Sequence, residues 1–337
     1  MRITKAIPVI EGMTRERFEA EIRPAEQPVV LRGLIAGWPA VVAAKQSDEA
    51  VAAYFRALDQ GRQTPVSLAP PAEQGRFFFT PDMKGYNFSV FHKTPGEVMD
   101  WLLAHRDDPD AVTAYAQSLV LAEHMPAFEG QNPMPVLAQS YGPRLWIGNR
   151  VRTQTHFDPS YNLACLVAGR RRFTLFPPEQ IVNLYPGPFD LAPGGVPVSM
   201  ASLEEPDFTA HPRFREALET AQFAELEPGD ALFIPYAWWH HVQSLAAFNL
   251  LVNYWWNEGS SDNAPMPHGV LYMALISIRD LPPSARAVWR RILDMYVFGD
   301  GEAAVAHLPK HGRGIFGDIT GEVIDRVRAY FKASLKL

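Results

Sequence analysis

Residues 155–178, THFDPSYNLACLVAGRRRFTLFPP, decide the fold class. They are short runs of β-type residues separated by residues that favour turns. Many short strands with turns between them are typical of a closed antiparallel barrel or jelly roll, and we predict that architecture. The same pattern continues outside this stretch in RLWIGN (144–149), ALFIP (231–235), WHHVQSL (239–245) and FNLLVNYWW (248–256).

The rest of the chain adds helices to this core. Helical spacing of apolar residues is visible at 14–23, 94–112, 283–298 and 320–335. Residues 183–225 interrupt the strands and are too long for a hairpin loop, which is typical of a functional wall or lid. We therefore predict a mainly β fold with flanking helices. Its parts are an N-terminal α/β part (1–135), a jelly-roll core (136–258) that contains the 183–225 insertion, and a C-terminal helical region (259–337).

Composition limits the partners and the location that the sequence predicts. The 337 residues are 47% hydrophobic and carry a net charge of −6. No run of Lys and Arg reaches the length typical of a nucleic-acid-binding segment, so we do not expect nucleic acid as a partner. Neither a signal peptide nor an apolar run of membrane-spanning length is visible, so we expect a cytoplasmic protein that does not enter membranes. The single cysteine, Cys165, lies in an apolar run and is predicted to be a core residue.

A His-x-Asp motif lies at His156 and Asp158. On a strand, residues two apart point to the same side, so this imidazole and this carboxylate could reach one metal ion. Chance is the alternative, because 10 His and 37 acidic residues in 337 positions predict roughly one such pair. His105 and Asp107 form a second pair in or at the end of a predicted helix, where residues two apart do not face each other. We take that second pair as the chance one.

His240 supplies a third candidate ligand. It lies in LEPGDALFIPYAWWHHVQSL (226–245), where a turn and a strand lead into a second strand. Two imidazoles and one carboxylate form the facial triad that leaves coordination positions open on iron(II). His240 and His241 point to opposite sides of a strand, so only one of them can be the ligand. We expect the other to be a surface histidine or one that supports the site.

The run GRRRFTLFPP (169–178) offers a cation for a cosubstrate. An oxygenase that couples oxygen activation to decarboxylation of 2-oxoglutarate needs a cation deep in the barrel for the far carboxylate. Arg171 shares its side of the strand with Phe173 and Leu175, so its guanidinium points inward if those two residues face the core. There it could form a bidentate pair with a carboxylate. The alternative is that all three arginines are surface charges on an edge strand.

These blocks resemble the cupin-like JmjC (Jumonji-C) hydroxylases, and within that family the asparaginyl hydroxylases. The resemblance covers most of the chain, and LEPGDALFIPYAWWHHVQS (226–244) and LLVNYWW (250–256) are among its specific matches. It implies a double-stranded β-helix fold. It also implies that iron(II) is bound by His156, Asp158 and His240.

The resemblance further implies the surroundings of the metal. Arg171 stands where the asparaginyl hydroxylases hold the far carboxylate of 2-oxoglutarate with a lysine. Trp255 matches a position that flanks the iron. Apart from the resemblance, we expect Trp239 to lie with the neighbouring tryptophans at the substrate pocket, the alternative being that tryptophan at a strand end is a core residue. The C-terminal helices correspond to a dimerisation region, so we expect a homodimer; the alternative is that they cover the barrel. The remaining residues implied at the 2-oxoglutarate site are Thr153, Asn162, Asn253 and, on a shorter match, Tyr115.

The predicted function is hydroxylation of a substrate C–H bond by an iron(II)- and 2-oxoglutarate-dependent dioxygenase, with molecular oxygen as the second cosubstrate. The resemblance makes a protein or peptide side chain the first expected substrate, and lysine demethylation is not expected because the resemblance is to hydroxylases. Residues 183–225 and 75–92 are expected to select the substrate. Nothing in their sequence identifies it, so a small molecule or a saccharide is left open. Two further alternatives are a metal cupin that acts without 2-oxoglutarate and a binding module that has lost turnover.

Overall fold

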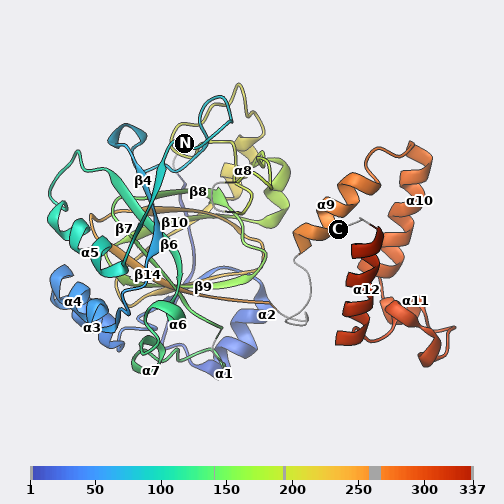
Figure 1. The fold of residues 1–337 in the computed structure, drawn as a ribbon, viewed down its shortest axis with the longest axis horizontal. Helices are drawn as coiled ribbons and strands as arrows, with labels where there is room; N and C mark the ends of the chain where they lie inside the picture. Colours follow the sequence, from blue (N-terminus) through green and yellow to red (C-terminus); the bar gives the residue numbers. More distant parts are fainter. Residues whose placement is uncertain (1–2, 140, 193–194, 258–266, 335–337) are drawn as a thin grey trace. The chain divides into compact units, whose positions relative to one another are not determined.

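The chain divides into two units, Met1–Trp256 and Asn257–Leu337. The first unit contains every β-strand that the structure describes, and the second contains helices (Figure 1). The predicted N-terminal part, residues 1–135, lies in the same unit as the strands of the barrel. The computed structural model describes residues 3–139, 141–192, 195–257 and 267–334.

Two β-sheets face each other in the first unit. The smaller has the strand order β1-β11-β10-β13-β8, and the larger has the order β2-β3-β12-β9-β14-β7-β6-β4-β5. Neighbouring strands are antiparallel except β1 with β11 and β2 with β3. This is the jelly-roll architecture that the sequence predicts. The strands are β1 Lys5–Ala6, β2 Val9–Glu11, β3 Val29–Arg32, β4 Thr64–Ala69, β5 Ser89–Lys93, β6 Thr113–Val120, β7 Arg144–Gly148, β8 Arg152–His156, β9 Tyr161–Ala168, β10 Arg171–Phe176, β11 Gln222–Leu226, β12 Ala231–Ile234, β13 Trp239–Ser244 and β14 Asn249–Trp256.

Strand β9 shows how the larger sheet is buried on both faces. Leu163 and Cys165 belong to a core cluster shared with the flanking helices, whereas Ala164 and Leu166 belong to a cluster between the two sheets. Successive side chains of a strand point to opposite faces, so a strand covered on both sides needs a continuous apolar run. This burial explains why NLACLVA (162–168) carries almost no polar residue.

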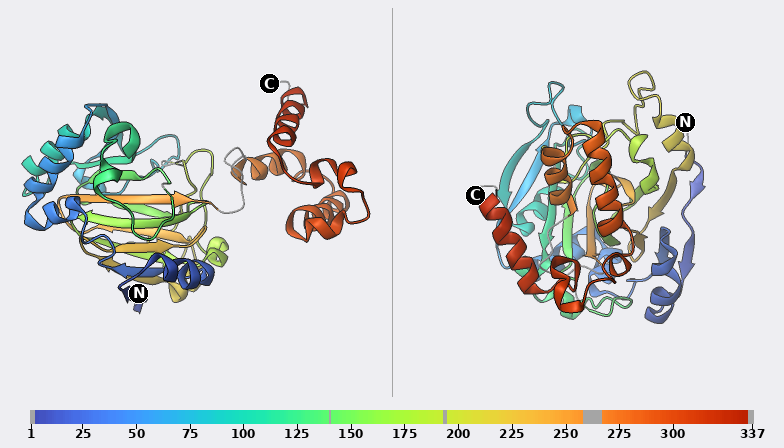
Figure 2. Two further views of the ribbon diagram at one scale, coloured as in Figure 1. Left: turned by 90° about the horizontal axis from the view of Figure 1, so that it is seen from below. Right: turned by 90° about the vertical axis from the view of Figure 1, so that its right-hand side faces the viewer.

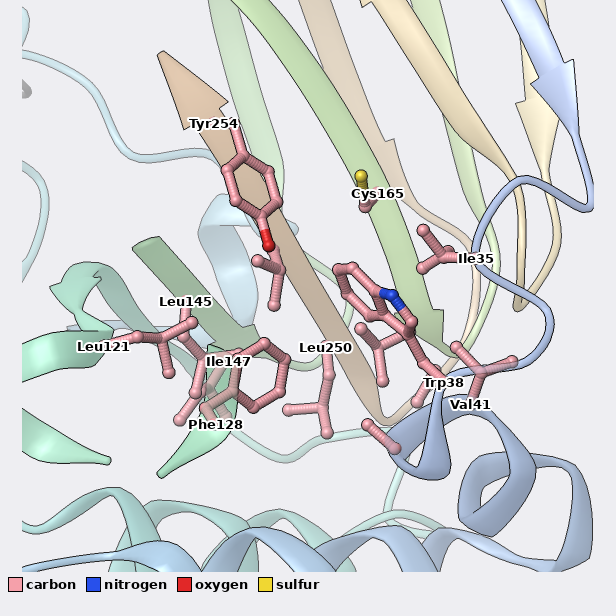
Figure 3. Packing of buried hydrophobic residues seen from close by; sticks show 14 of the residues in the cluster. Ile35, Trp38, Val41, Leu121, Phe128, Leu145, Ile147, Cys165, Leu250 and Tyr254 are labelled. Atoms are coloured by element: carbon pink, nitrogen blue, oxygen red, sulfur yellow. The ribbon is translucent and has the colours of Figure 1, made fainter. Parts of the chain in front are cut away.

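Helices cover the outer face of the larger sheet (Figures 1 and 2). Figure 3 shows part of this outer cluster, in which Trp38, just before α3, and Phe128 of α7 pack near Ile147 and Leu250 of the sheet. The rings of Trp38 and Phe128 meet edge to face, with centroids 5.7 Å apart. The helical elements of the first unit are α1 Arg15–Arg17, η1 Phe18–Ile22, α2 Arg23–Ala25, α3 Pro39–Gln46, α4 Asp48–Leu58, η2 Pro71–Glu73, α5 Pro95–Ala104, α6 Leu121–His124, α7 Phe128–Gln131, η3 Pro178–Val182 and α8 Phe214–Thr220.

Helix α5 is shorter than the sequence predicts. It begins with a capping box, in which the Thr94 side chain accepts a hydrogen bond from the Glu97 amide and the Glu97 side chain accepts one from the Thr94 amide. It ends at Ala104 rather than near residue 112. Pro109 disfavours helical geometry in the residue before it, which limits any extension of the helix through RDDPDAV (106–112).

The insertion is attached to the edge of the smaller sheet. Val198 forms an isolated antiparallel bridge with His156, and the Ser199 amide donates to the Thr155 carbonyl oxygen at 2.7 Å. The insertion therefore continues the sheet beyond β8. Its last residues, from Gln222, already belong to strand β11.

The second unit is helical and carries large apolar side chains on its surface. Val288 and Phe298 are 55% and 77% exposed. No helix among the described residues is long and apolar enough to cross a membrane. The helical elements are α9 Pro267–Ser277, α10 Pro283–Leu293, η4 Asp294–Phe298, α11 Gly301–Ala304, η5 Lys310–Gly312, η6 Gly314–Phe316 and α12 Gly321–Ser334.

Candidate active site

Three side chains that could bind a metal converge at one end of two paired strands. His156 ends β8 and is the register partner of His240 on β13, while Asp158 follows β8 by two residues. The two imidazole rings are 4.2 Å apart between centroids, and His240 Nε2 lies 3.6 Å from Asp158 Oδ2. All three potential ligand atoms lie within 4.8 Å of one another, and no other such group of three occurs among the described residues.

Backbone carbonyls fix the orientation of both imidazoles. His156 Nδ1 lies 2.8 Å from the Gln154 carbonyl oxygen, and His240 Nδ1 lies 3.0 Å from the Trp238 carbonyl oxygen. A carbonyl can only accept, so each Nδ1 donates its proton and each Nε2 keeps a lone pair for a metal. Burial, together with the neighbouring His156, lowers the pKa of His240 to about 4. His240 is therefore neutral at pH 7, which is the form that binds a metal.

Arg171 is a cation buried in the same barrel. Its side chain is 2% exposed, and it shares the inner side of β10 with Phe173. Burial lowers the pKa of the guanidinium, while its hydrogen bond to the Tyr115 hydroxyl raises it; arginine nevertheless stays charged. Nε and Nη2 of Arg171 have no hydrogen-bond partner among the described residues. Two buried donors on a cation, left without partners, fit a carboxylate that binds in this cavity.

One cavity contains both groups. Its walls come from the facing sides of the two sheets. The predicted site residues that line it are Tyr115, Thr153, His156, Asp158, Asn162, Arg171, His240, Asn253 and Trp255. The lining residues that the sequence did not single out for the site are Trp146, Ala164, Phe173, Val242 and Leu251.

Comparison with known families explains this arrangement. A family model described as a cupin-like domain matches residues 15–262. The chain belongs to the cupin-like JmjC family. Members of this family are oxygenases that use Fe(II) and 2-oxoglutarate. The donor set fits both groups. Two imidazoles and a carboxylate suit iron(II), and the two Arg171 donors that lack partners among the described residues suit a dicarboxylate.

The curated relatives in this family differ in name and in length. The chain is 35% identical to "Lysine-specific demethylase JMJ31" of Arabidopsis thaliana over 39% of the chain and 24% of that relative. It is 26% identical to "Lysine-specific demethylase 8" of Danio rerio over 75% of the chain and 59% of that relative. It therefore covers less than two thirds of either protein. It is also 25% identical to "tRNA wybutosine-synthesizing protein 5" of Gallus gallus over 85% of the chain and 92% of that relative.

Trp239 and His241, the two residues that flank His240 in sequence, point away from the metal site. Trp239 precedes His240 on β13 and so faces the outer side of the smaller sheet, where it packs against Phe157 at 4.8 Å between ring centroids. It is not among the residues that line the cavity, in contrast to its predicted place at the substrate pocket. His241 also faces outward but is buried, with Nε2 3.0 Å from Oε1 of Glu204 in the insertion.

Sequence reasoning missed Trp146, although its signal was present. In RLWIG (144–148) the neighbours Leu145 and Ile147 are fully buried on the outer face of β7, so Trp146 faces the other sheet. A large aromatic residue of inner parity in a barrel strand points to the cavity. Its partner could not be read from the strand, because that partner is 107 positions away in sequence.

Proposed function

We propose that the chain hydroxylates a C–H bond of a protein or peptide side chain, using Fe(II), 2-oxoglutarate and molecular oxygen. The observation that carries the proposal is one cavity. The His156, Asp158 and His240 group meets the guanidinium of Arg171 there, and two of its donors have no partner among the described residues. Side chains of one pocket therefore offer both a site for iron and a cation for 2-oxoglutarate.

The residues divide the work by position. His156, Asp158 and His240 would hold the iron from one side and leave the other side open. Arg171, with Tyr115 and Thr153 beside it, would hold the far carboxylate of 2-oxoglutarate and orient the cosubstrate. The aromatic and aliphatic lining limits access of water. When bound, the iron and 2-oxoglutarate supply the oxidising chemistry that these side chains do not have.

Support for a protein substrate comes from the relatives, two of which are named as lysine-specific demethylases. The sequence resemblance predicts a protein or peptide side chain without specifying which, and the names of these relatives make methylated lysine one candidate. The name of the relative from Gallus gallus makes tRNA the polymer to test against proteins. Small molecules and saccharides complete the set of substrates to be screened.

The walls that would select the substrate are the 75–92 segment and the 183–225 insertion. They are joined where the Tyr86 hydroxyl donates to the Leu191 carbonyl oxygen at 3.0 Å. Phe78 and Phe79 pack against Val198, the residue that bridges to His156. Substrate contacts on these walls would therefore lie beside a metal ligand.

A metal cupin that acts without 2-oxoglutarate is the competing function. It would have no use for a buried cation with two donors unpaired among the described residues, since such a cation is costly. The structure thus favours a function that employs Arg171.

The deciding experiment is an anaerobic titration of the metal-free protein with Fe(II) and then 2-oxoglutarate, followed by the visible charge-transfer absorption of the complex. We expect a band that needs both components, disappears in Asp158→Ala and weakens in Arg171→Ala. Iron binding without a band would favour the cupin that needs no 2-oxoglutarate. Absence of metal binding would leave a binding module without turnover.

We also propose that two copies associate through the C-terminal unit. Apolar side chains as exposed as Val288 and Phe298 are costly in water, and a matching surface on a second copy would cover them. The sequence resemblance also predicts a homodimer whose interface lies in the C-terminal helices.

A further inference from the structure

A chain of hydrogen bonds crosses three neighbouring strands on the inner face of the larger sheet. Trp146 on β7 donates from Nε1 to Asn253 Oδ1 at 2.8 Å. Asn253 on β14 donates from Nδ2 to Oδ1 of Asn162 on β9 at 3.3 Å. Strand β14 pairs with β7 on one side and β9 on the other, so the three side chains follow one another across the sheet.

The order of donors in this chain is set by the tryptophan. An indole N–H can only donate a hydrogen bond. The Asn253 NH₂ group is also a donor, so it cannot replace the Asn253 oxygen as the partner of Trp146. The Asn253 carbonyl oxygen must face Trp146, and its NH₂ group is then directed to Asn162. The Asn162 oxygen is occupied in turn. The polar group that Asn162 can offer to a ligand in the cavity is therefore its NH₂ group.

This order matters because the expected ligand is an anion. Asn162 lines the same cavity as Arg171 and is 4% exposed. A buried carboxylate needs donors, and an amide oxygen turned toward it would be repelled. If both asparagine amides rotated together, Asn162 would present an acceptor where a donor is required. Within the described residues, Trp146 is the group that opposes this rotation.

Trp146 itself is held in place by aromatic neighbours. Its ring lies 5.9 Å from the ring of Tyr115 and 5.8 Å from that of Trp255, measured between centroids. Both neighbours line the cavity. The indole is therefore fixed by packing before any ligand binds, and the amide order that it imposes is present in advance.

We propose that Trp146 is a positioning residue that orients the amides of Asn253 and Asn162 so that the cavity presents a donor to 2-oxoglutarate. The proposal rests on the proposed function, because it assumes 2-oxoglutarate as the ligand. Trp146 acts through the asparagines and need not touch the cosubstrate.

The test compares Trp146→Phe with Trp38→Phe by measuring the dissociation constant of 2-oxoglutarate in the anaerobic Fe(II) protein. Trp38 donates to the Pro133 carbonyl oxygen at 2.8 Å, so the control loses a hydrogen bond of the same length in the outer cluster. We expect Trp146→Phe to weaken binding about 10-fold, which corresponds to the net loss of one hydrogen bond. We expect Trp38→Phe to change thermal stability and leave the dissociation constant as it is.

A double-mutant cycle separates positioning from general packing. If Trp146 acts through the amides, Trp146→Phe should have little further effect on binding in an Asn162→Ala background, whereas a packing defect would weaken binding equally in both backgrounds. Unchanged binding by Trp146→Phe in the wild-type background overturns the inference, and so does additivity in the cycle. Failure of the wild-type protein to bind 2-oxoglutarate would instead overturn the proposed function.

A measurement on the wild-type protein covers the case in which Trp146→Phe does not fold. In an NMR titration with 2-oxoglutarate and a diamagnetic divalent metal, the Asn162 side-chain NH₂ resonances should shift strongly as that group engages the anion. The Trp146 indole N–H should exchange slowly with solvent before and after the addition. Absence of both signatures contradicts the proposed order.

Discussion

Arg171 shows how much of the site a single strand pattern reveals. Alternation along β10 predicted that its guanidinium points inward with Phe173, and the structure places both at the cavity. The same alternation placed His156 and Asp158 near each other. The same alternation shows why the prediction of Trp239 at the substrate pocket was wrong. A residue next to His240 has to face the opposite side of β13. What one strand cannot reveal is a contact to another strand.

Replacing Arg171 by methionine is expected to separate stability from binding. Arg171→Met removes a buried cation that has two donors without partners among the residues described, and it keeps a similar volume. The melting temperature of the ligand-free protein should therefore rise or stay unchanged. Binding of 2-oxoglutarate should weaken by about 10- to 100-fold, because charged hydrogen bonds contribute about 1.5–3 kcal/mol. Differential scanning calorimetry and binding titration of the same samples test both parts. A lower melting temperature with unchanged binding would show that Arg171 is structural.

Cys165 is expected to be chemically inert in the folded protein. Its side chain is fully buried, and burial raises the pKa of the thiol far above its usual range. Because the thiolate is the reactive form, iodoacetamide at pH 8 should label the native chain no faster than it unfolds. Mass spectrometry in the presence and absence of urea measures this. Rapid labelling of the native chain would mean that β9 opens locally.

At the scale of strands and turns, the sequence predicted which segments are extended and left their neighbours undetermined. The runs at 231–235 and 248–256 became β12 and β14, yet the order that places β9 between them depends on pairings between distant segments. The attachment of the insertion to β8 was likewise invisible, since Val198 lies in a loop-like sequence. Helix α5 ended at Ala104, and Pro109 limits its extension through residues 106–112.

The turn between β9 and β10 should be sensitive to a single methyl group. Gly169 has φ +80°, and a Cβ there would lie 2.3 Å from the Phe248 carbonyl oxygen, whereas Gly61 has φ +72° and open space around it. Gly61→Ala should cost only about 1 kcal/mol of unfolding free energy, from the left-handed backbone. Gly169→Ala should cost clearly more, since its backbone has to move as well. Urea denaturation of the two variants compares them, and equal losses would contradict the close packing of this turn.

At the scale of the whole molecule, family membership decides the cofactors and leaves the substrate to the walls of the cavity. The core motifs were visible in the sequence because metal ligands and the cosubstrate cation tolerate few residue types. Substrate selection has no such code, because any shape-complementary surface on the 75–92 and 183–225 segments can perform it. The surface of the C-terminal unit could be predicted only in part. The sequence showed its apolar residues, but only the structure showed that they are exposed.

Association through the C-terminal unit predicts a charge-sensitive dimer. Sedimentation of the full chain should give a dimer that Val288→Glu shifts toward monomer, because an unpaired charge would enter an apolar contact. Ser284→Glu adds the same charge at an exposed polar position of α10 and should leave the dimer intact. A wild-type monomer at micromolar concentration, or equal effects of the two variants, would count against this surface.

The two-sided burial of β9 has a practical consequence for protein engineering. Residues 163, 165 and 167 face the helix-packed side, whereas Asn162 and Ala164 face the cavity. A randomised library restricted to the second set would sample new ligands while the outer packing stays untouched. A library restricted to the first set would chiefly vary expression and heat tolerance. The two sets of positions on β9 can therefore be varied almost independently of each other.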